Sequence, residues 1–437
     1  MRFPSWRPHT CSCDTTTHQS TISLHQKQEK QHAHRYHDNS SSATSYTTSN
    51  NSNSNSTSTS TCSLESNLSI QTLPSVPSLN PSPQTLTLSV SHHCLTTLTP
   101  HPSRPVTSLA VNSTLLYAAT NHQINVYDLH TCTNLHTFQT TSSGSTKTIA
   151  FSNDIILTTH QDSKIRVWHK NHRIITTLPT VNDRLRRFLL PQNYVAIRRH
   201  HKRLWIEHAD AVTGLAVTNG AIYSVSWDRT LKIWRLSDFR CVESVRAHED
   251  AVNAVAVSND GTVYTGSADR CIRVWARPQG EKRHVLVATL EKHKSAVNAL
   301  ALNDDASVLF SGACDRSILV WEKEDSANHM VVSGALRGHH KAILCLVNVS
   351  HLLLSGSADR TVRIWRRASD DGRFGCLAVL DGHRKPVKSL AAIPDYDQNH
   401  TSPDASLSVF SGSLDGEIKI WRVSIASQSN HDPELNS

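Results

Sequence analysis

Histidine, serine or threonine, aspartate and tryptophan recur together at similar spacings in the C-terminal half of this 437-residue chain. A His, a Ser and an Asp are the residue types of a nucleophilic triad, in which the His activates the Ser hydroxyl and the Asp orients the His. The five sets are His208, Ser224, Asp228 and Trp234; His248, Thr265, Asp269 and Trp275; His293, Ser311, Asp315 and Trp321; His339, Ser355, Asp359 and Trp365; and His383, Ser411, Asp415 and Trp421. An enzyme needs one such site, so five copies predict a structural module. We expect each set, called a tetrad below, to be a hydrogen-bonded network of buried polar atoms that satisfy one another.

The residues around each tetrad have the pattern of short strands. Apolar runs such as AVTGLAV and AVNALAL follow the histidines, and alternating runs such as LKIW and IRVW end at the tryptophans. Such runs, separated by turn residues, predict four strands per unit. The first four histidines of the tetrads lie 40 to 46 residues apart, a period that matches WD repeats and excludes tetratricopeptide, ankyrin and leucine-rich arrays.

On these motifs the chain resembles the WD-repeat family from about residue 94 to 423. The resemblance implies an all-β fold, a β-propeller of four-stranded blades around a central channel. Two weaker units end at Tyr127 and Trp168, which makes seven blades. The run CLTTLTPH at 94–101 aligns with CLAVLDGH at 376–383. We therefore expect an N-terminal strand to complete the last blade and close the ring.

The first two blades depart from the tetrad pattern. Blade 1 keeps His101 but has Tyr117, Asn121 and Tyr127 at the other places. Blade 2 keeps Thr158, Asp162 and Trp168 and has no histidine near Ser142. We expect both blades to open more easily than the others.

Outside the repeats the composition changes. Residues 39–63 are almost entirely Ser, Thr and Asn, and four prolines follow between 74 and 83. Such segments have too little to bury to offset the entropy of ordering. The sequence predicts a disordered arm over 1–90, the propeller over 91–424 and a disordered tail over 425–437.

Composition and missing motifs exclude several classes of function. The first thirty residues hold no apolar signal-peptide core, no apolar run approaches the ~18 residues of a membrane span, and the ten cysteines are scattered. We expect a cytoplasmic or nuclear protein without disulfides. The chain contains no Walker loop, Gly-x-Gly-x-x-Gly, His-Glu-x-x-His or Gly-x-Ser-x-Gly. We therefore expect no catalytic residue, cofactor, metal or small-molecule substrate, and the net charge of +8 favours acidic partners.

The turns beside the histidines are candidates for partner binding. In this fold the two residues after each histidine sample one face of the ring, and the charged ones are Asp210, Glu249, Asp250, Lys294, Lys341, Arg384 and Lys385. An acidic sector followed by a basic one would orient a partner of complementary charge. The alternative is that solvated turns vary freely in charge. Trp227, in the turn before Asp228, is either an interface anchor or a residue packed on a neighbouring turn.

A basic insertion of about twenty residues, at about 181–203, separates Trp168 from His208. Its candidate binding residues are Arg198, Arg199, Lys202 and Arg203. If it follows the run RIITTL at 173–178 it lies on the same face as the histidines, and if it precedes LWIEH at 204–208 it lies on the opposite face. It would suit an acidic protein segment, a phosphorylated peptide or a nuclear-import factor, unless it is simply a solvated loop.

The run NYVAIRRHHKRLWIEHADAVTGLAV, followed by SVSWDRTLKIWRLSDFRCVES, is similar to the plant JINGUBANG-type WD-repeat proteins. This resemblance implies a regulatory scaffold in plant growth or development, with protein partners such as transcription regulators. A ubiquitin-ligase substrate receptor is a second hypothesis, weakened because no Trp-Asp-x-Arg box ends a repeat. A nucleic-acid or anionic-lipid binder acting through the insertion is a third, and nucleic acid is the less expected partner. The oligomeric state stays open.

Overall fold

A computed structural model describes residues 76–79, 88–101, 103–140, 144–198, 201–218, 220–323, 330–368, 372–395 and 405–427. All of them belong to one compact unit, Ser69–Ser437. The arm up to residue 75 and the tail from residue 428, both expected to be disordered, lie outside the described residues. Residues 425–427, which the prediction also assigned to the tail, are instead the last residues of a strand.

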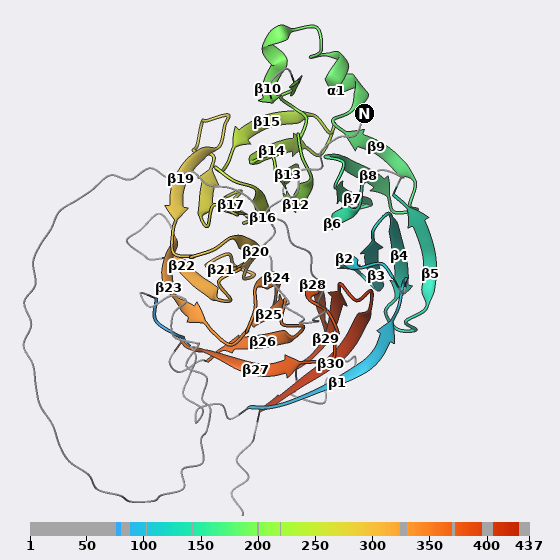
Figure 1. Ribbon diagram of the computed structural model, residues 1–437, viewed down its shortest axis with the longest axis vertical. Helices are drawn as coiled ribbons and strands as arrows, with labels where there is room; N and C mark the ends of the chain where they lie inside the picture. Colours follow the sequence, from blue (N-terminus) through green and yellow to red (C-terminus); the bar gives the residue numbers. More distant parts are fainter. Residues whose placement is uncertain are drawn as a thin grey trace, which may run out of the picture. The chain divides into compact units, whose positions relative to one another are not determined.

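Seven four-stranded antiparallel blades make up most of the described chain (Figure 1). In blades 1 to 6 the strands lie side by side in sequence order. The first three blades are β2 (Val106–Asn112), β3 (Leu115–Thr120), β4 (Gln123–Asp128) and β5 (Asn134–Gln139); β6 (Thr146–Ser152), β7 (Ile155–His160), β8 (Ile165–His169) and β9 (Ile174–Leu178); and β12 (Val212–Thr218), β13 (Ala221–Ser226), β14 (Thr230–Arg235) and β15 (Cys241–Arg246).

Blades 4 to 6 repeat this plan. They are β16 (Val252–Val257), β17 (Val263–Ser267), β18 (Ile272–Ala276) and β19 (Val285–Leu290); β20 (Val297–Leu302), β21 (Val308–Ala313), β22 (Ile318–Lys323) and β23 (Met330–Leu336); and β24 (Ile343–Val349), β25 (Leu352–Ser357), β26 (Val362–Arg367) and β27 (Phe374–Leu380). The first strand of each blade is innermost and the fourth is outermost (Figure 1).

Blade 7 closes the ring with strands from both ends of the propeller. Its own strands are β28 (Val387–Asp395), β29 (Ala405–Ser413) and β30 (Ile418–Ser427), and the fourth is β1 (Leu88–Leu98), antiparallel to β30. Figure 1 shows β1 in blue beside β30 in red. Cys94 lies opposite Trp421 as Cys376 lies opposite Trp365, which confirms the alignment predicted from the sequence.

Inner strands hold neighbouring blades together through side-chain bonds to the backbone of the next blade. Thr213 Oγ1 donates to Val252 O at 2.6 Å, and Asn253 and Asn298 donate to Val297 O and Ile343 O at 3.0 and 2.8 Å. Seven apolar clusters fill the spaces between adjacent blades, as around Trp234, which packs with Leu157 of blade 2. The core is therefore spread around the ring, and each blade depends on its neighbours.

The N-terminal boundary of the propeller differs from the prediction. β1 begins at Leu88, so its first residues lie inside the arm over 1–90 that was expected to be disordered. Val76–Leu79 also has a defined place, because it hydrogen-bonds to the outer strand of blade 5. Both segments are ordered since each finds the free edge of a strand to pair with.

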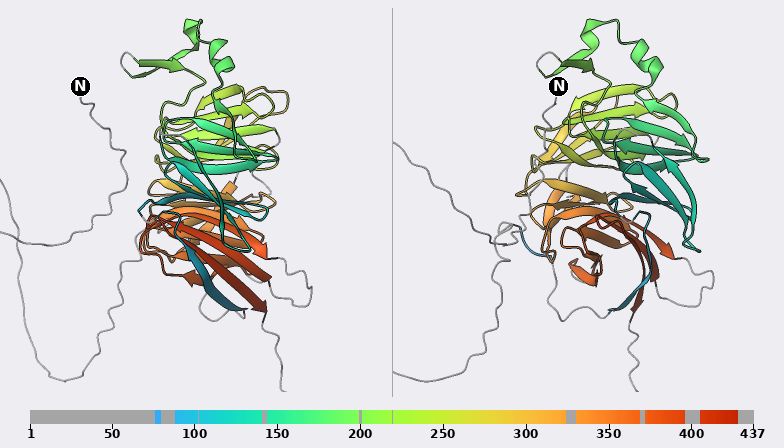
Figure 2. Two further views of the ribbon diagram at one scale, coloured as in Figure 1. Left: turned by 90° about the vertical axis from the view of Figure 1, so that its right-hand side faces the viewer. Right: turned by 45° about the vertical axis from the view of Figure 1, so that its right-hand side comes forward.

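The basic insertion follows the outer strand of blade 2, which resolves the two placements left open by the sequence. It holds α1 (Val181–Leu185), the 3₁₀ turn η1 (Pro191–Asn193) and the hairpin of β10 (Tyr194–Arg198) and β11 (His201–Leu204). The insertion begins at the face of the ring that carries the tetrad histidines. Asp183 then accepts a hydrogen bond from Cys241 N, at the end of β15 that lies nearer the opposite face. The insertion thus runs along the outer edge of blades 2 and 3, where Figure 2 shows it standing out from the ring.

No described helix is long and apolar enough to cross a membrane.

Candidate functional site

The tetrad of blade 6 shows how the recurring polar residues are used. His339 precedes β24, Ser355 lies in β25, Asp359 in the turn after it and Trp365 in β26. Trp365 Nε1 donates to Ser355 Oγ at 2.8 Å, His339 Nε2 lies 2.8 Å from the same oxygen, and His339 Nδ1 lies 2.8 Å from Asp359 Oδ2. With a neutral imidazole, the chain of donors runs from Trp to Ser to His and from the other ring nitrogen to Asp.

Four further tetrads have this arrangement. The Nδ1 atoms of His208, His248, His293 and His383 lie 3.0, 2.9, 2.8 and 3.4 Å from Asp228, Asp269, Asp315 and Asp415. The Nε2 atoms of the same rings lie 2.9, 2.8, 2.8 and 2.8 Å from the hydroxyls of Ser224, Thr265, Ser311 and Ser411. Those hydroxyls accept from the Nε1 atoms of Trp234, Trp275, Trp321 and Trp421 at 2.9, 3.0, 2.8 and 2.8 Å. Each set in blades 3 to 5 is therefore one connected network. In blade 7 the 3.4 Å contact between His383 and Asp415 is not a hydrogen bond, and His383 Nδ1 has no hydrogen-bond partner among the described residues.

The order Asp–His–Ser in these networks resembles a catalytic triad, but the hydroxyls are closed to solvent. These hydroxyls belong to residues with no exposed surface: Ser224, Thr265, Ser311, Ser355 and Ser411. The five tryptophans are at most 5% exposed, the value for Trp275 and Trp421. A hydroxyl buried in this way cannot reach a substrate. Residues such as Thr265, Trp275 and Ser311 thus stabilise the blade and form no part of a surface that a partner could touch.

Burial and pairing hold the charges of the tetrads in place. Burial lowers the pKa of His208, His339 and His383, against the raising effect of their aspartates. Burial alone would raise the pKa of the Asp359 carboxyl, but hydrogen bonds from His339 and Thr361 hold it below its ordinary value. The networks of blades 3, 6 and 7 therefore combine a neutral imidazole with a carboxylate.

Blade 2 completes a smaller network with a histidine that sequence reasoning missed. His160 Nε2 lies 2.8 Å from Thr158 Oγ1, which also accepts from Trp168 Nε1 at 2.9 Å. His160 is fully buried and burial lowers its pKa to about 3. Asp162 pairs with Arg166 instead. The signal was His160 two places after Thr158, where the five blades with a tetrad have Ser or Ala.

Blade 1 has no equivalent network among its described residues. The expected hydroxyl position was Tyr117, but the register puts Ala118 opposite Asn125, the place that Ser224 takes opposite Lys232 in blade 3. The reason is that the chain is one residue shorter here, since Tyr127 lies nine residues after Ala118 whereas Trp234 lies ten residues after Ser224. Tyr117 instead packs edge-on against Phe151 of blade 2, with ring centroids 5.0 Å apart.

Blade 7 has a looser tetrad. The residue two places after the tetrad aspartate is Thr or Ser in three tetrads and bonds the carboxylate, but it is Glu417 in blade 7. Ligand atoms of His383, Asp415 and Glu417 lie within 4.8 Å of one another, as a metal site would require. However, His383 Nε2 bonds Ser411 and Asp415 accepts backbone bonds from Arg384 and Glu417. These bonds recur in the other tetrads, but the bond from the histidine Nδ1 to the aspartate, present in those four, is missing in blade 7, where His383 Nδ1 has no hydrogen-bond partner among the described residues.

The tetrad aspartates also fix the turn that follows each histidine. Their carboxylates accept hydrogen bonds from the backbone N–H of the next residue, at 2.7, 3.2, 3.0, 2.9 and 2.9 Å for Ala209, Glu249, Lys294, His340 and Arg384. We call the face formed by these turns, together with the turns between second and third strands, the rim. All seven charged candidates are exposed there: Asp210, Glu249, Asp250, Lys294, Lys341, Arg384 and Lys385.

The rim is more basic than the predicted pattern of acidic and basic sectors. Sequence reasoning missed an arginine that follows the tetrad aspartate in blades 3 to 6, at Arg229, Arg270, Arg316 and Arg360. These arginines have φ of 71°, 74°, 70° and 79°, which places them at the tips of the turns. Glu249 is also paired with Arg246 at 2.8 Å. The acidic sector is therefore partly neutralised, and the basic sector from Lys294 to Lys385 dominates.

Trp227 lies half-buried on the rim. Lys147, from the inner strand of blade 2, has its Nζ 5.4 Å from the centre of the indole. Burial, and then the nearby Lys388, lower the pKa of the Lys147 amine. Trp227 thus packs against the neighbouring blade, as the second reading from the sequence expected, and is partly exposed.

The insertion uses much of its positive charge internally. Arg184 pairs with Glu207 at 3.1 Å, Arg187 pairs with buried Asp183, and Arg203 donates to His208 O at 3.0 Å. Lys202 is exposed, while Arg199 and the Arg198 side chain lie outside the described part. Its surface is instead rich in exposed apolar side chains: Val181, Leu185, Phe188, Leu189, Leu190, Val195 and Ile197.

Comparison with known proteins gives the class of this molecule. The WD40 model, described as WD domain, G-beta repeat, matches residues 200–235, 239–276, 284–322, 330–366 and 374–422. The chain therefore belongs to the WD40-repeat β-propeller family, whose members are usually non-catalytic. Blades 1 and 2 lie outside the matched segments and still form four-stranded sheets.

Individual relatives are distant, and each is matched over only part of its length. The chain is 32% identical to Striatin-4 of Homo sapiens over 141 residues, 28% of this chain and 19% of that protein. It is 28% identical to Striatin-3 of Rattus norvegicus over 174 residues, 35% and 22% of the two chains. An uncharacterised WD-repeat protein of Schizosaccharomyces pombe is 28% identical over 127 residues, 29% and 34%. The matched regions span about a fifth to a third of these relatives.

Proposed function

We propose that this chain is a non-catalytic scaffold that binds protein partners on the rim. The observation that carries the proposal is the bond from each tetrad aspartate to the backbone of the rim turn. Rim side chains are exposed, but the backbone beneath them is fixed from inside the blade. A pre-organised charged surface loses less entropy on binding than a mobile one.

The partner that fits this rim is an acidic protein segment. Lys294, Lys341, Arg384 and Lys385 are exposed along three consecutive blades, and Arg316 and Arg360 lie at the tips of adjacent turns. Basic groups on one face attract a carboxylate-rich or phosphorylated segment and raise its association rate. Trp227, which is half-buried, supplies an aromatic anchor on the same face.

Charge reversal with a matched control tests this proposal. The rim variant is Lys341→Glu with Arg384→Glu, and the control is Lys282→Glu with Arg283→Glu, two exposed residues between the third and fourth strands of blade 4, on the opposite face. Proximity labelling with the full chain should lose a defined set of proteins for the rim variant and keep that set for the control. If both variants keep the same set, the rim is not the docking surface.

The resemblance to plant JINGUBANG-type proteins supports a narrower role. On that basis we propose regulation of plant growth or development, with transcription regulators as partners and residence in the cytoplasm or nucleus. A fluorescent fusion in plant cells tests the location, and the identities of the proteins lost by the rim variant test the partner class. Exclusion from both compartments would contradict this narrower role without affecting the rim.

A further inference from the structure

The four residues Val76–Leu79 lie along the outer edge of blade 5 and pair with it through one isolated β-bridge. Ser78 pairs in parallel with Ala335 of β23, Ala335 N donates to Pro77 O at 2.9 Å, and Leu79 N donates to Ala335 O at 3.0 Å. Arg337 Nη2 donates to Val76 O at 2.8 Å, and Phe374 N of blade 6 donates to Leu79 O at 3.1 Å. We call Val76–Leu79 the strap; it is the short blue segment beside β23 in Figure 1.

The two aliphatic side chains of the strap enter the spaces on either side of blade 5. Val76 is 3% exposed and packs with Leu290, Trp321 and Met330 between blades 4 and 5. Leu79 packs against the cluster of Phe310 and Phe374 between blades 5 and 6.

Blade 5 is shaped for this contact. A Cβ on Gly334 would lie 2.3 Å from Leu79 Cγ, so a side chain there would exclude the strap. Gly334 and Ala335 are buried, whereas the outer strand of blade 4 exposes Val285, Leu286 and Val287 by 45%, 46% and 45%. Small residues on β23 therefore leave room for an added backbone.

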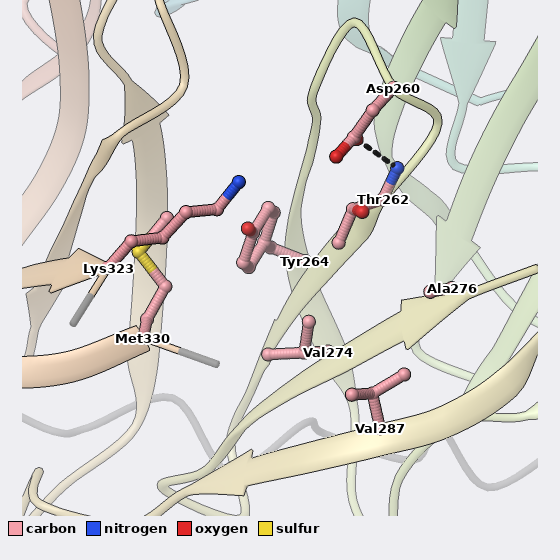
Figure 3. A pocket seen from close by; sticks show the side chains of 8 residues that line it. All are labelled: Asp260, Thr262, Tyr264, Val274, Ala276, Val287, Lys323 and Met330. Carbon is pink, nitrogen blue, oxygen red and sulfur yellow. Dashed lines mark hydrogen bonds between the residues drawn. The ribbon is translucent and has the colours of Figure 1, made fainter. Parts of the chain in front are cut away.

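A pocket lies next to this contact, since Tyr264, Val274 and Met330 of its lining belong to the same apolar cluster as Val76. It is lined by Tyr264, Val274, Val287 and Met330, with Lys323 and Asp260 adding polar groups (Figure 3). Because the strap runs parallel to β23, residues preceding Val76 in a bound segment point toward Met330, the first residue of β23. A longer segment would thus find a further apolar site.

We propose that this edge of blade 5 is a peptide-docking groove, occupied by the chain's own strap and opened to a partner when the strap leaves. The groove takes an extended segment of the form aliphatic–Pro–x–Leu. Main-chain bonds to Ala335 supply affinity, and the two apolar spaces select the flanking side chains. Proline fits at the second position because Pro77 takes part through its carbonyl, which accepts a hydrogen bond from Ala335 N, and needs no N–H of its own.

The strap is suited to exchange because it is short and tethered. Only eight residues, 80–87, join it to β1, so its effective concentration at the groove is on the order of millimolar. A partner segment competes with that local concentration, which makes the strap an intramolecular inhibitor of the groove. This inference does not depend on the rim, because the groove lies on the outer edge of the ring.

Binding of a labelled peptide to the full chain tests the proposal. The probe is a fluorescent peptide of residues 70–83, and the strap-released variant is Val76→Ser with Leu79→Ser. We expect at least tenfold tighter binding to the strap-released variant than to the unmodified chain, because the cis segment no longer competes. Adding Gly334→Val should abolish that binding, whereas adding Thr176→Val, at the matching register of the blade 2 outer strand, should preserve it.

Equal binding to both chains, no binding to the strap-released variant, or binding that survives Gly334→Val would overturn the proposal. Hydrogen exchange of the unmodified chain gives a second test that needs no variant. The Ala335 amide should exchange at least tenfold faster than the Leu319 amide of the same blade, since strap release exposes only the first. Equal rates would show a permanently closed groove. A particle of twice the monomer mass in light scattering would indicate that the strap of one copy occupies the groove of another. That result would contradict a strap bound to its own chain.

Discussion

At the scale of single residues, the buried histidines control both the interior of each blade and the surface above it. Each tetrad histidine faces a Ser or Thr hydroxyl through one ring nitrogen and an aspartate through the other. The aspartate then holds the backbone of the next exposed residue. A change inside the blade therefore reaches the rim through one side chain.

Acid should destabilise the propeller through His160. Its pKa is about 3 in the folded chain and ordinary in the unfolded chain, so between pH 6.5 and 3 only the unfolded chain binds the proton, and stability falls as the pH falls through that window. From pH 7 to pH 5 this residue should contribute a loss of about 2 kcal/mol. We expect the free energy of unfolding, measured with urea, to drop between pH 7 and pH 5 by about 2 kcal/mol less in His160→Gln than in the unmodified chain. The same pH dependence in both chains would rule out a neutral buried His160.

Removal of one tetrad hydroxyl should weaken its blade. Ser355→Ala leaves Trp365 Nε1 and His339 Nε2 without their shared partner in a buried site. Each unsatisfied group costs about 1–3 kcal/mol, so we expect a loss of at least 2 kcal/mol (about 2–6 in all) by urea denaturation. Thr289→Ala, at an exposed position of β19, is the control and should change stability by less than about 0.5 kcal/mol. Equal effects of the two changes would mean that the network stabilises nothing.

The five tetrads were predictable because the hydroxyl and the aspartate lie ten and six residues before every tetrad Trp, and the histidine lies 26 to 28 residues before it in four of the five. His160 was not predictable, because it lies at the end of β7 rather than before the first strand of its blade and reaches Thr158 in the same strand. The rim arginines were visible as Asp-Arg pairs, but their positions became significant only once the turns were known to share a face. A spacing rule finds residues at repeated sequence positions. It misses a residue such as His160, which takes the same role from a different position.

At the scale of elements, blade 1 stands apart from the other six. Its β3–β4 turn is too short to hold the tetrad aspartate, and Ala118 takes the place of the hydroxyl. Blade 2 was also expected to be weak, but the His160 network gives it a buried anchor. The structure thus separates two blades that the sequence treated alike.

Hydrogen exchange should therefore rank the blades. We expect amides of β3 and β4 to exchange at least tenfold faster than those of β25 and β26 in blade 6, with β7 and β8 of blade 2 close to blade 6. Exchange of intact chains followed by peptide mass spectrometry measures all three in one experiment. Blade 2 exchanging as fast as blade 1 would show that the His160 network does not replace a tetrad.

At the scale of the whole molecule, closure of the ring depends on one strand from the N-terminal side. The β1–β30 pairing was predictable because its motif repeats that of β27. The strap and the path of the insertion were not, because both depend on which edges and spaces the folded blades leave open. Periodicity identifies the repeated unit and gives no information on segments that bind to its outside.

Deletion of residues 1–98 should open the ring. It leaves β30, a ten-residue strand, without its partner in blade 7, and an unpaired edge of that length promotes association between chains. We expect loss of the single cooperative thermal transition and of the monomer peak in size-exclusion chromatography. Deletion of residues 1–75, which keeps both the strap and β1, is the control and should retain both. A cooperative monomer after the longer deletion would contradict closure by β1.

Site-specific photo-crosslinking tests the proposed docking surface most directly. A photoreactive amino acid replaces Lys341 on the rim in one chain and Arg283 on the opposite face in another, and both full chains are irradiated in cells. The proposal predicts that protein adducts form from position 341, depend on Arg384 and Lys385, and are several-fold fewer from position 283. Adducts formed equally from both positions, or from position 283 alone, would contradict a scaffold that binds its partners through the rim.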